Sequence, residues 1–307
     1  MDMKATMLSR VRAYLAHRRA LGYKLRIEGQ MLENFARYAD RSGHRGPLTW
    51  KLALHWAGLP ENADSLYRAR RLEVVRVFAR HQSVLEPATE IPPRRIFGPA
   101  HRRKSPHIYS PAQIRRLLRR ASKLDGQLRP FTYKILIGLL ACTGLRISEA
   151  LSLEIADVDL KQGVITVRKS KYHHSRLVPL HPTCLRRLRQ YACRRQKLFP
   201  LATHFFVSDR GDRYGYSTVR SVFRELARNL ALVSNGHRLH VRLHDLRHTF
   251  ACRVLSQWQR SKNGATGRVA ILSRYLGHHR VSDTFWYLSA LPELFLQAAK
   301  NFPPPTP

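Results

Sequence analysis

Apolar residues recur at helical spacing through the first 85 residues of the chain. Three sets of apolar residues have the spacing that places each set on one face of a helix. The first set is Leu8, Val11 and Leu15, the second is Ile27, Met31, Phe35 and Tyr38, and the third is Leu72, Val75 and Ala79. Glycine and proline near residues 43–47 and 58–60 interrupt the pattern between the sets. The spacing therefore predicts a small helical domain over residues 1–86.

The pattern is lost between residues 87 and 106. This stretch is rich in proline and carries a cluster of arginines and a lysine. Together with the preceding Glu86 it reads EPATEIPPRRIFGPAHRRKSP. Proline-rich sequence without periodicity is typical of a linker. We expect a basic linker over residues 87–106 that either lies along phosphates between two domains or is only solvated.

A second domain is predicted over residues 107–307. It opens with Ser110 as a helix cap, Pro111 in the first turn and Gln113 completing a capping box. A buried helix is expected near residues 131–142, two strands at residues 164–168 and 176–180, and a third short strand at residues 203–209. The rest, to about residue 299, is predicted to be mainly helical. The fold class is therefore mainly α with a small antiparallel β-sheet.

Charge narrows the choice of partner. The 307 residues include 55 Lys and Arg against 20 Asp and Glu, which gives a formal net charge of +35. Hydrophobic residues at 44% and charged residues at 24% are ordinary for a globular protein, so a buried core is expected. A cationic excess of this size needs an anionic partner. Because the basic residues are spread along the whole chain, nucleic acid is favoured over a membrane surface.

Other protein classes fit less well. The first residues lack the apolar core of a signal peptide. The longest apolar run, residues 135–142, is shorter than the ~20 residues of a membrane span. The four cysteines form no CxxC pair, and no Cys/His set has zinc spacing, so we expect free thiols and no metal. A cytoplasmic protein without membrane or cofactor fits best.

Four short stretches carry the residues with chemistry. They are TGLRISEA with Arg146 and Glu149, the turn with Lys169 and Lys171, HDLRHTF with His244 and Arg247, and LGHHRVSDTFWYL with His278 and Tyr287. Phosphoryl transfer needs these residue types. Two arginines can grip the oxygens of a phosphate. A lysine can protonate a leaving oxygen, histidines can exchange protons, and a tyrosine can become a covalent carrier.

In this order the stretches resemble the tyrosine recombinase family, also called the phage integrase family. TGLRISEALSLEIADVDL looks like its first arginine motif and HDLRHTFA like its H-x-x-R motif. LGHH, with a tyrosine nine residues after His278, looks like its terminal histidine and nucleophile. The resemblance covers residues 106–300, while residues 1–85 are similar only in kind to the family's helical core-binding domain. The DTFWYLSA ending is most similar to recombinases of transposon-type mobile elements.

The resemblance implies a role for each matched residue. Arg146 and Arg247 would clamp the phosphate, and Tyr287 would be the nucleophile. His244 would assist proton transfer around the tyrosine, and His278 would hydrogen-bond the phosphate in the transition state. The family often has a histidine shortly after the tyrosine, where this chain has YLSA, so that contact is not expected here.

Two assignments have an alternative. Lys171 looks like the lysine that protonates the leaving 5′-oxygen, since it lies five residues before Arg176, and Lys169 remains the second candidate. The spacing to the tyrosine favours His278 over the adjacent His279. Glu149 would orient the arginine or a histidine.

The resemblance also implies the reaction and the assembly. Tyr287 would attack a phosphodiester, form a 3′-phosphotyrosine and release a 5′-hydroxyl, with no cofactor. A core-binding domain over residues 1–86 and a catalytic domain over residues 107–307 would clamp duplex DNA. A homotetramer would hold two sites, with residues 292–299 (PELFLQAA) as the segment that docks on a neighbouring protomer. Whether companion recombinases are required stays open.

Two other functions are weighed against this one. A type IB topoisomerase uses the same kinds of residues, but the helical N-terminal region and the RISEA motif favour the recombinase. An accessory DNA-binding protein could keep the fold without the chemistry, and the complete set of catalytic residue types argues against it.

Overall fold

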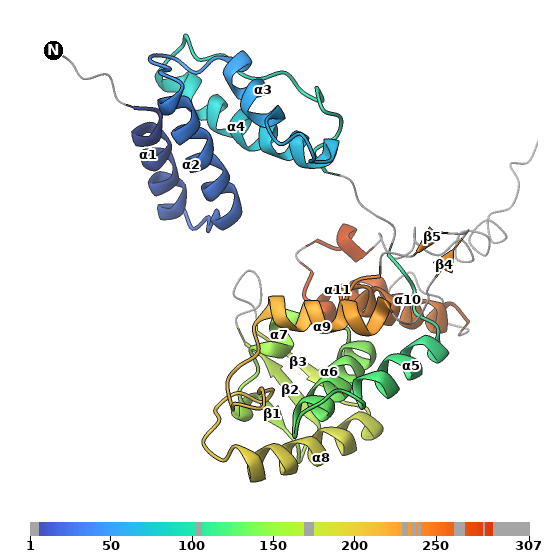
Figure 1. The fold of residues 1–307 in the computed structure, drawn as a ribbon. Helices are drawn as coiled ribbons and strands as arrows, with labels where there is room; N and C mark the ends of the chain where they lie inside the picture. The colour runs from blue at the N-terminus through green and yellow to red at the C-terminus, as the bar shows by residue number, and fades with distance from the viewer. Residues whose placement is uncertain are drawn as a thin grey trace, which may run out of the picture. The chain divides into compact units, whose positions relative to one another are not determined.

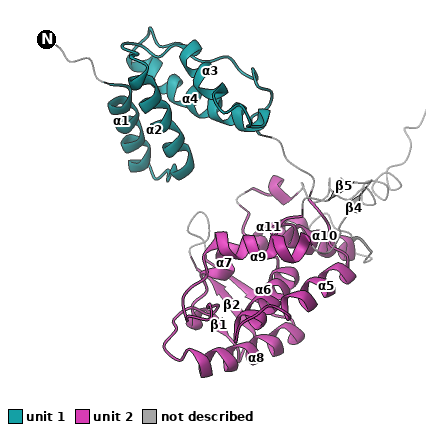
Figure 2. Ribbon diagram, viewed as in Figure 1, with its two compact units in different colours: residues 1–104 teal, residues 105–307 magenta. Residues whose placement is uncertain are grey.

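The chain forms two compact units in the computed structural model, residues 1–104 and 105–307, which Figure 2 colours separately. The structure describes residues 6–101, 106–168, 175–228, 233–234, 237–238, 241–260, 268–278 and 280–284. Helices make up most of both units, and the only sheets in the described ranges are small and antiparallel (Figure 1). The predicted fold class is confirmed. None of the described helices is long and apolar enough to cross a membrane.

The first unit is a four-helix assembly. Its helices are α1 (Met7–Ala20), α2 (Arg26–Arg41), α3 (Trp50–Gly58) and α4 (Ser65–Leu85). Phe35, Trp56 and Phe78 lie at the centre of its core. The buried stripe of α2 runs from Gly29 through Leu32 to Phe35 and Ala39, so Ile27, predicted to lie on that face, is 66% exposed.

Side-chain caps fix where these helices begin. The Thr49 and Asp64 side chains accept from backbone N–H groups in the first turns of α3 and α4. Asp40 of α2 accepts from the backbone N–H groups of Met7 and Leu8, at 2.8 and 3.1 Å, and so caps α1 from a neighbouring helix. These acceptors satisfy donors that helix starts leave unpaired.

The segment after α4 packs back onto the first unit. The Glu90 backbone N–H donates to the carbonyl of Leu48 at 2.8 Å, and Arg76 donates to the carbonyl of Pro92 at 2.8 Å. Phe97 packs against the core of the unit. Within residues 87–106, where a linker was expected, these contacts hold Glu90, Pro92 and Phe97 to the first unit.

The second unit contains most of the chain. Its helices are α5 (Pro111–Ala121), α6 (Arg129–Thr143), α7 (Ile147–Leu151), the 3-10 helix η1 (Ile155–Asp157), α8 (Pro182–Leu198), α9 (Tyr216–Arg228), α10 (Asp245–Arg260) and α11 (Arg268–Leu276). The capping box predicted at Ser110 and Gln113 is present at the start of α5. The buried helix expected near residues 131–142 is α6, which packs against α5, α8 and α10.

A three-stranded antiparallel sheet lies in the second unit. Its strands are β1 (Val158–Asp159), β2 (Val164–Val167) and β3 (Arg176–Pro179), in that order. Ile165 pairs with Val178, and both side chains are buried in the core. A separate two-stranded pair joins β4 (Val233–Ser234) and β5 (His237–Arg238). The strands expected at 164–168 and 176–180 are therefore present.

The third strand, expected at residues 203–209, is not formed. His204 and Val207 each make one isolated bridge, to Glu154 and Arg213. Phe205, Phe206 and Val207 are all buried. Three successive buried side chains do not alternate between two faces, so this apolar run fills the core without a continuous strand partner.

Candidate active site

Arg146 lies at the turn between α6 and α7. Gly144 ends α6 with a φ of 64°, a left-handed conformation that suits glycine. Arg146 then caps α7 and donates from its backbone N–H to the Glu149 carboxylate at 2.9 Å. Its Nη1 also donates to Glu149 Oε1 at 2.9 Å, and its Nη2 to the carbonyl of Gly277 at 2.9 Å. The predicted first arginine motif is therefore a tight turn that fixes its guanidinium from two sides.

Glu149 holds two arginines, one of which the sequence did not single out for a role. The side chain is 7% exposed and receives Nη1 and Nη2 of Arg176, at 3.0 and 2.8 Å, in addition to Arg146. Burial alone would raise the pKa of this carboxyl, but the hydrogen bonds and charges of Arg176 and then Arg146 lower it to about 2. The expectation that Glu149 orients an arginine agrees with this geometry.

Arg247 lies in the first turn of α10 and is 2% exposed. Its Nη1 donates to the carbonyl of Gly144 at 2.8 Å and its Nη2 to the carbonyl of Leu276 at 2.6 Å. These carbonyls lie at the C-terminal ends of α6 and α11, where helices leave acceptors unpaired and favour positive charge. The guanidinium thus joins two helix ends.

Three arginines converge on the end of α11. Arg176 Nε donates to the carbonyl of Tyr275 at 2.8 Å, Arg247 to that of Leu276 and Arg146 to that of Gly277. These are consecutive carbonyls, so residues that are far apart in the sequence are brought into one cationic cluster. A guanidinium has five N–H donors. The hydrogen bonds described for the Arg146 guanidinium use one donor on Nη1 and one on Nη2. The cluster can therefore present fixed donors to an anion.

Three histidines border the arginine cluster. His278 holds its Nδ1 2.8 Å from the hydroxyl of the buried Thr284. The rings of His244 and His248 meet edge to face, 4.9 Å between centroids. The side chain of His244 reaches the surface, while the other two are half-buried. Partial removal of the rings from solvent, followed by the charges of Arg247 and Arg146, lowers the pKa of His244 and of His278 to about 4.

The pKa of His248 falls to about 3, first through burial and then through His244 and its arginine neighbours. All three rings are neutral imidazoles at pH 7. Each can donate a hydrogen bond from one nitrogen and accept with the other. The site therefore combines fixed positive charge with neutral groups that can transfer a proton.

The chain matches known proteins over nearly its whole length. The model of the Phage integrase family matches residues 109–293. A similar protein is the integrase/recombinase y4rB of Sinorhizobium fredii (strain NBRC 101917 / NGR234), a name given to that protein provisionally. The two chains are 37% identical over 305 residues, which is 97% of each chain. This chain belongs to the phage integrase family. The predicted resemblance is confirmed, and the protein is a tyrosine-type site-specific DNA recombinase.

Further relatives support the same assignment. The tyrosine recombinase XerD of Rhizobium meliloti (strain 1021) is 29% identical to this integrase-family chain, over 81% of this chain and 78% of its own length. Among solved structures, the Tn1549 transposon integrase in complex with transposon right end DNA aligns with a TM-score of 0.68. That alignment covers 92% of this chain and 94% of the other at 16% identity, so it supports the fold.

The candidate site residues are described in part. The side chains of Arg146 and Glu149 are in direct contact, and His244, Arg247 and His278 lie near them. Lys169, Lys171, His279 and Tyr287 lie outside the described residues, as does the segment 292–299. No group of three or more His, Cys, Asp or Glu side chains in the described part of the chain is arranged to hold a metal ion.

Sequence reasoning did not single out three residues that lie in this cluster. Arg176 was used only to count back to Lys171, yet it bonds both Glu149 and α11. His248 lies one helical turn after His244 in HDLRHTF, and that spacing is a signal that could have found it. Thr284 has no sequence signal, because its role depends on the fold around His278.

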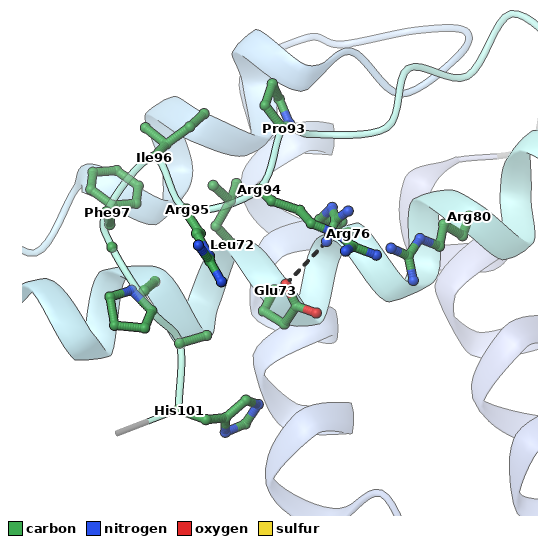
Figure 3. Close-up of a pocket in the computed structure, with 14 residues that line it drawn as sticks. Leu72, Glu73, Arg76, Arg80, Pro93, Arg94, Arg95, Ile96, Phe97 and His101 are labelled. Carbon is green, nitrogen blue, oxygen red and sulfur yellow. Dashed lines mark hydrogen bonds and ion pairs between the residues drawn. The ribbon is translucent and has the colours of Figure 1, made fainter. Parts of the chain in front are cut away.

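The first unit has a basic pocket of about 330 Å³ (Figure 3). Arg76 and Arg80 of α4 line it on one side, and Arg94 and Arg95 of the segment that packs back line it on the other. Arg76 is 7% exposed and pairs with Glu73, while the other three arginines are exposed. Four arginines facing one carboxylate make this pocket suited to an anion such as a phosphate.

Proposed function

We propose that the arginine cluster around α11 is the phosphate-binding part of the recombinase active site. The observation that carries this proposal is the anchoring of Arg146, Arg176 and Arg247 on three consecutive carbonyls at one helix end. Such anchoring fixes the guanidinium positions before any substrate arrives. Preorganised donors of this kind typically contribute about 10²–10³-fold each to the rate of a reaction that develops negative charge.

The chemical step uses Tyr287 as nucleophile. Its Oη forms a bond to phosphorus while the bond from phosphorus to the 5′-oxygen breaks, which leaves a 3′-phosphotyrosine. Lys171, or Lys169 as the alternative, donates the proton that the 5′-oxygen takes up as it leaves. The 5′-hydroxyl of another strand then attacks the same phosphorus and releases the tyrosine, so the bond energy is conserved and no cofactor is needed.

The histidines take separate roles in this scheme. In the tautomer in which Nδ1 of His278 accepts from the Thr284 hydroxyl, Nε2 carries the proton and can donate to a non-bridging oxygen of the phosphate. His244, neutral at pH 7 and adjacent to the arginines, suits proton transfer around the tyrosine hydroxyl. Because these rings are uncharged, proton transfer does not first require one of them to lose a proton to solvent.

The first unit is proposed as the core-binding domain that holds the DNA. Its basic pocket between α4 and residues 93–101 fits a backbone phosphate, and the net charge of +35 supports strong binding of duplex DNA. We further propose a homotetramer on two sites, with residues 292–299 docking on a neighbour. Similar solved structures include a transposon integrase and a lambda integrase tetramer bound to a Holliday junction, and they motivate the proposals of a mobile element and of a tetramer. We place this activity in the bacterial cytoplasm as part of the same proposal.

Recombination between two sites on one plasmid tests the function. The sites are first isolated by selecting bound duplexes from fragments of the host genome. The expected result is deletion or inversion of the DNA between them, with each junction joining one half of one site to the other half of the second. Relaxation of supercoils without exchanged junctions would favour a topoisomerase, and binding without any strand cleavage would favour an accessory protein.

The choice between the two lysines has its own test. Lys171→Ala should block cleavage of ordinary DNA and recover it on a substrate whose 5′-bridging oxygen is sulfur, because a thiolate leaves without protonation. Lys169→Ala, as the matched control, should cleave both substrates alike. Rescue of Lys169→Ala and not of Lys171→Ala would reverse the assignment.

A further inference from the structure

Two cysteines that the recombination scheme does not use lie in contact in the second unit. Cys142 is in the last turn of α6 and Cys184 in the first turn of α8, and their sulfur atoms are 3.2 Å apart. Cys142 is exposed and Cys184 half-buried, so reagents from solvent can reach the pair. This contact could not be predicted, because the two residues are far apart in the chain and belong to no CxxC motif.

The two thiols have different chemical characters. Cys142 donates its S–H to the sulfur of Cys184, which lowers the pKa of Cys184 and raises that of Cys142. Cys184 is the third residue of α8, at the positive end of the helix dipole. Cys184 is therefore the thiol that ionises first, and Cys142 is positioned to attack it after oxidation.

We propose that Cys142 and Cys184 form a disulfide when the recombinase meets a hydroperoxide. The Cys184 thiolate attacks the distal peroxide oxygen, the O–O bond breaks, and Cys184 becomes a sulfenic acid while the peroxide leaves as water or an alcohol. The Cys142 sulfur then attacks the Cys184 sulfur, and the sulfenic hydroxyl leaves as water with the Cys142 thiol proton. Two sulfurs are oxidised by one electron each, and one peroxide is reduced by two electrons. Reduction by a dithiol reverses the change.

Closing the disulfide would displace the end of α6. A disulfide bond is about 2.05 Å long, so the two sulfurs must approach by about 1.1 Å from their present 3.2 Å. Cys142 precedes by two residues Gly144, whose carbonyl accepts from Arg247. A shift of about 1 Å in a positioning group can cost about 10²-fold in rate. Oxidation is thus expected to slow DNA cleavage reversibly.

Mass spectrometry of the full-length protein tests the disulfide directly. The reduced protein is treated with a small excess of hydrogen peroxide at neutral pH, alkylated with N-ethylmaleimide and digested with trypsin without reduction. The expected product joins ILIGLLACTGLR, which contains Cys142, to LVPLHPTCLR, which contains Cys184. It should be absent from Cys142→Ser and Cys184→Ser and present in Cys193→Ser, a control in the middle of α8.

A second measurement uses the reduced wild type and needs no variant. Limiting N-ethylmaleimide should label Cys184 faster than the exposed Cys193. Two free, alkylated thiols at Cys142 and Cys184 in the folded, peroxide-treated protein would overturn the proposal. So would a disulfide that joins Cys193 or links two chains in place of this pair.

The effect on catalysis is read from covalent DNA cleavage and rests on the proposed function. Oxidised wild type and oxidised Cys193→Ser should cleave about 10²-fold more slowly than their reduced forms and recover in dithiothreitol. A disulfide with unchanged cleavage would refute the link between the pair and Arg247. Failure of reduced wild type to cleave any selected DNA would count against the proposed function alone, because the peptide result does not depend on activity.

Discussion

Replacing Glu149 by glutamine tests how strongly this carboxylate holds Arg146 and Arg176. Glutamine has the shape of the protonated acid, so the substitution removes the charge and keeps the size. The pKa of Glu149 falls from 4.5 to about 2 in the folded protein. At about 1.4 kcal/mol per pKa unit, Glu149→Gln should cost the second unit about 3 kcal/mol of unfolding free energy at pH 7.

The pH dependence of this cost follows from the direction of the shift. A carboxyl whose folded pKa is depressed stabilises fully above its unfolded pKa, and the stabilisation is lost as the pH falls through the folded value. The difference between wild type and Glu149→Gln should therefore shrink from about 3 kcal/mol at pH 7 to about 2 kcal/mol at pH 3.5.

Native-state hydrogen exchange of amides in α6 and α10 measures this free energy in the second unit alone. Glu225→Gln, at an exposed position of α9, is the matched control and should change stability by less than about 0.5 kcal/mol. A Glu149→Gln cost below about 1 kcal/mol at pH 7, or one that does not change with pH, would refute the inferred strength of the Arg146 and Arg176 contacts.

Two further predictions concern groups that shape the site. Thr284→Val removes the hydroxyl 2.8 Å from His278 Nδ1, and single-turnover cleavage should slow about 3–10-fold with DNA binding unchanged, whereas an unchanged rate would exclude this orienting role. Gly144→Ala places a Cβ 2.5 Å from the Phe250 ring at a φ of 64°. Hydrogen exchange should show a clearly larger loss of unfolding free energy for Gly144→Ala than for the control Gly43→Ala. A Cβ at Gly43 meets nothing within 4 Å, so only the about 1–2 kcal/mol of left-handed strain applies there. Equal losses would contradict the clash.

The fold was predictable where local patterns decide it. The capping box at Ser110 and the apolar run of α6 are local signals, and both give the predicted elements. The strand expected at residues 203–209 is absent. A run of apolar residues is typical of a strand, but here three of them in succession are buried in the core. The packing of residues 87–101 onto α4 could not be foreseen, because proline-rich sequence carries no periodic signal of contact.

The motifs predict candidate site residues, but they do not reveal the contacts between those residues. Arg146, His244, Arg247 and His278 are predicted because their spacing is characteristic of the family. They could not reveal that the arginines are held by consecutive carbonyls of α11, since a carbonyl acceptor leaves no trace in residue identity. The contact between Cys142 and Cys184 is hidden in the same way.

The covalent step is the central claim, and Tyr287→Phe tests it most directly. Wild type and variant are incubated with a nicked suicide substrate that carries the selected recombination site, and protein–DNA adducts are separated on a denaturing gel and mapped by mass spectrometry. The account predicts an adduct on Tyr287 in the wild type, and no adduct in Tyr287→Phe although that variant still folds and binds DNA. An adduct that maps to another tyrosine such as Tyr275, or that persists in Tyr287→Phe, would contradict it.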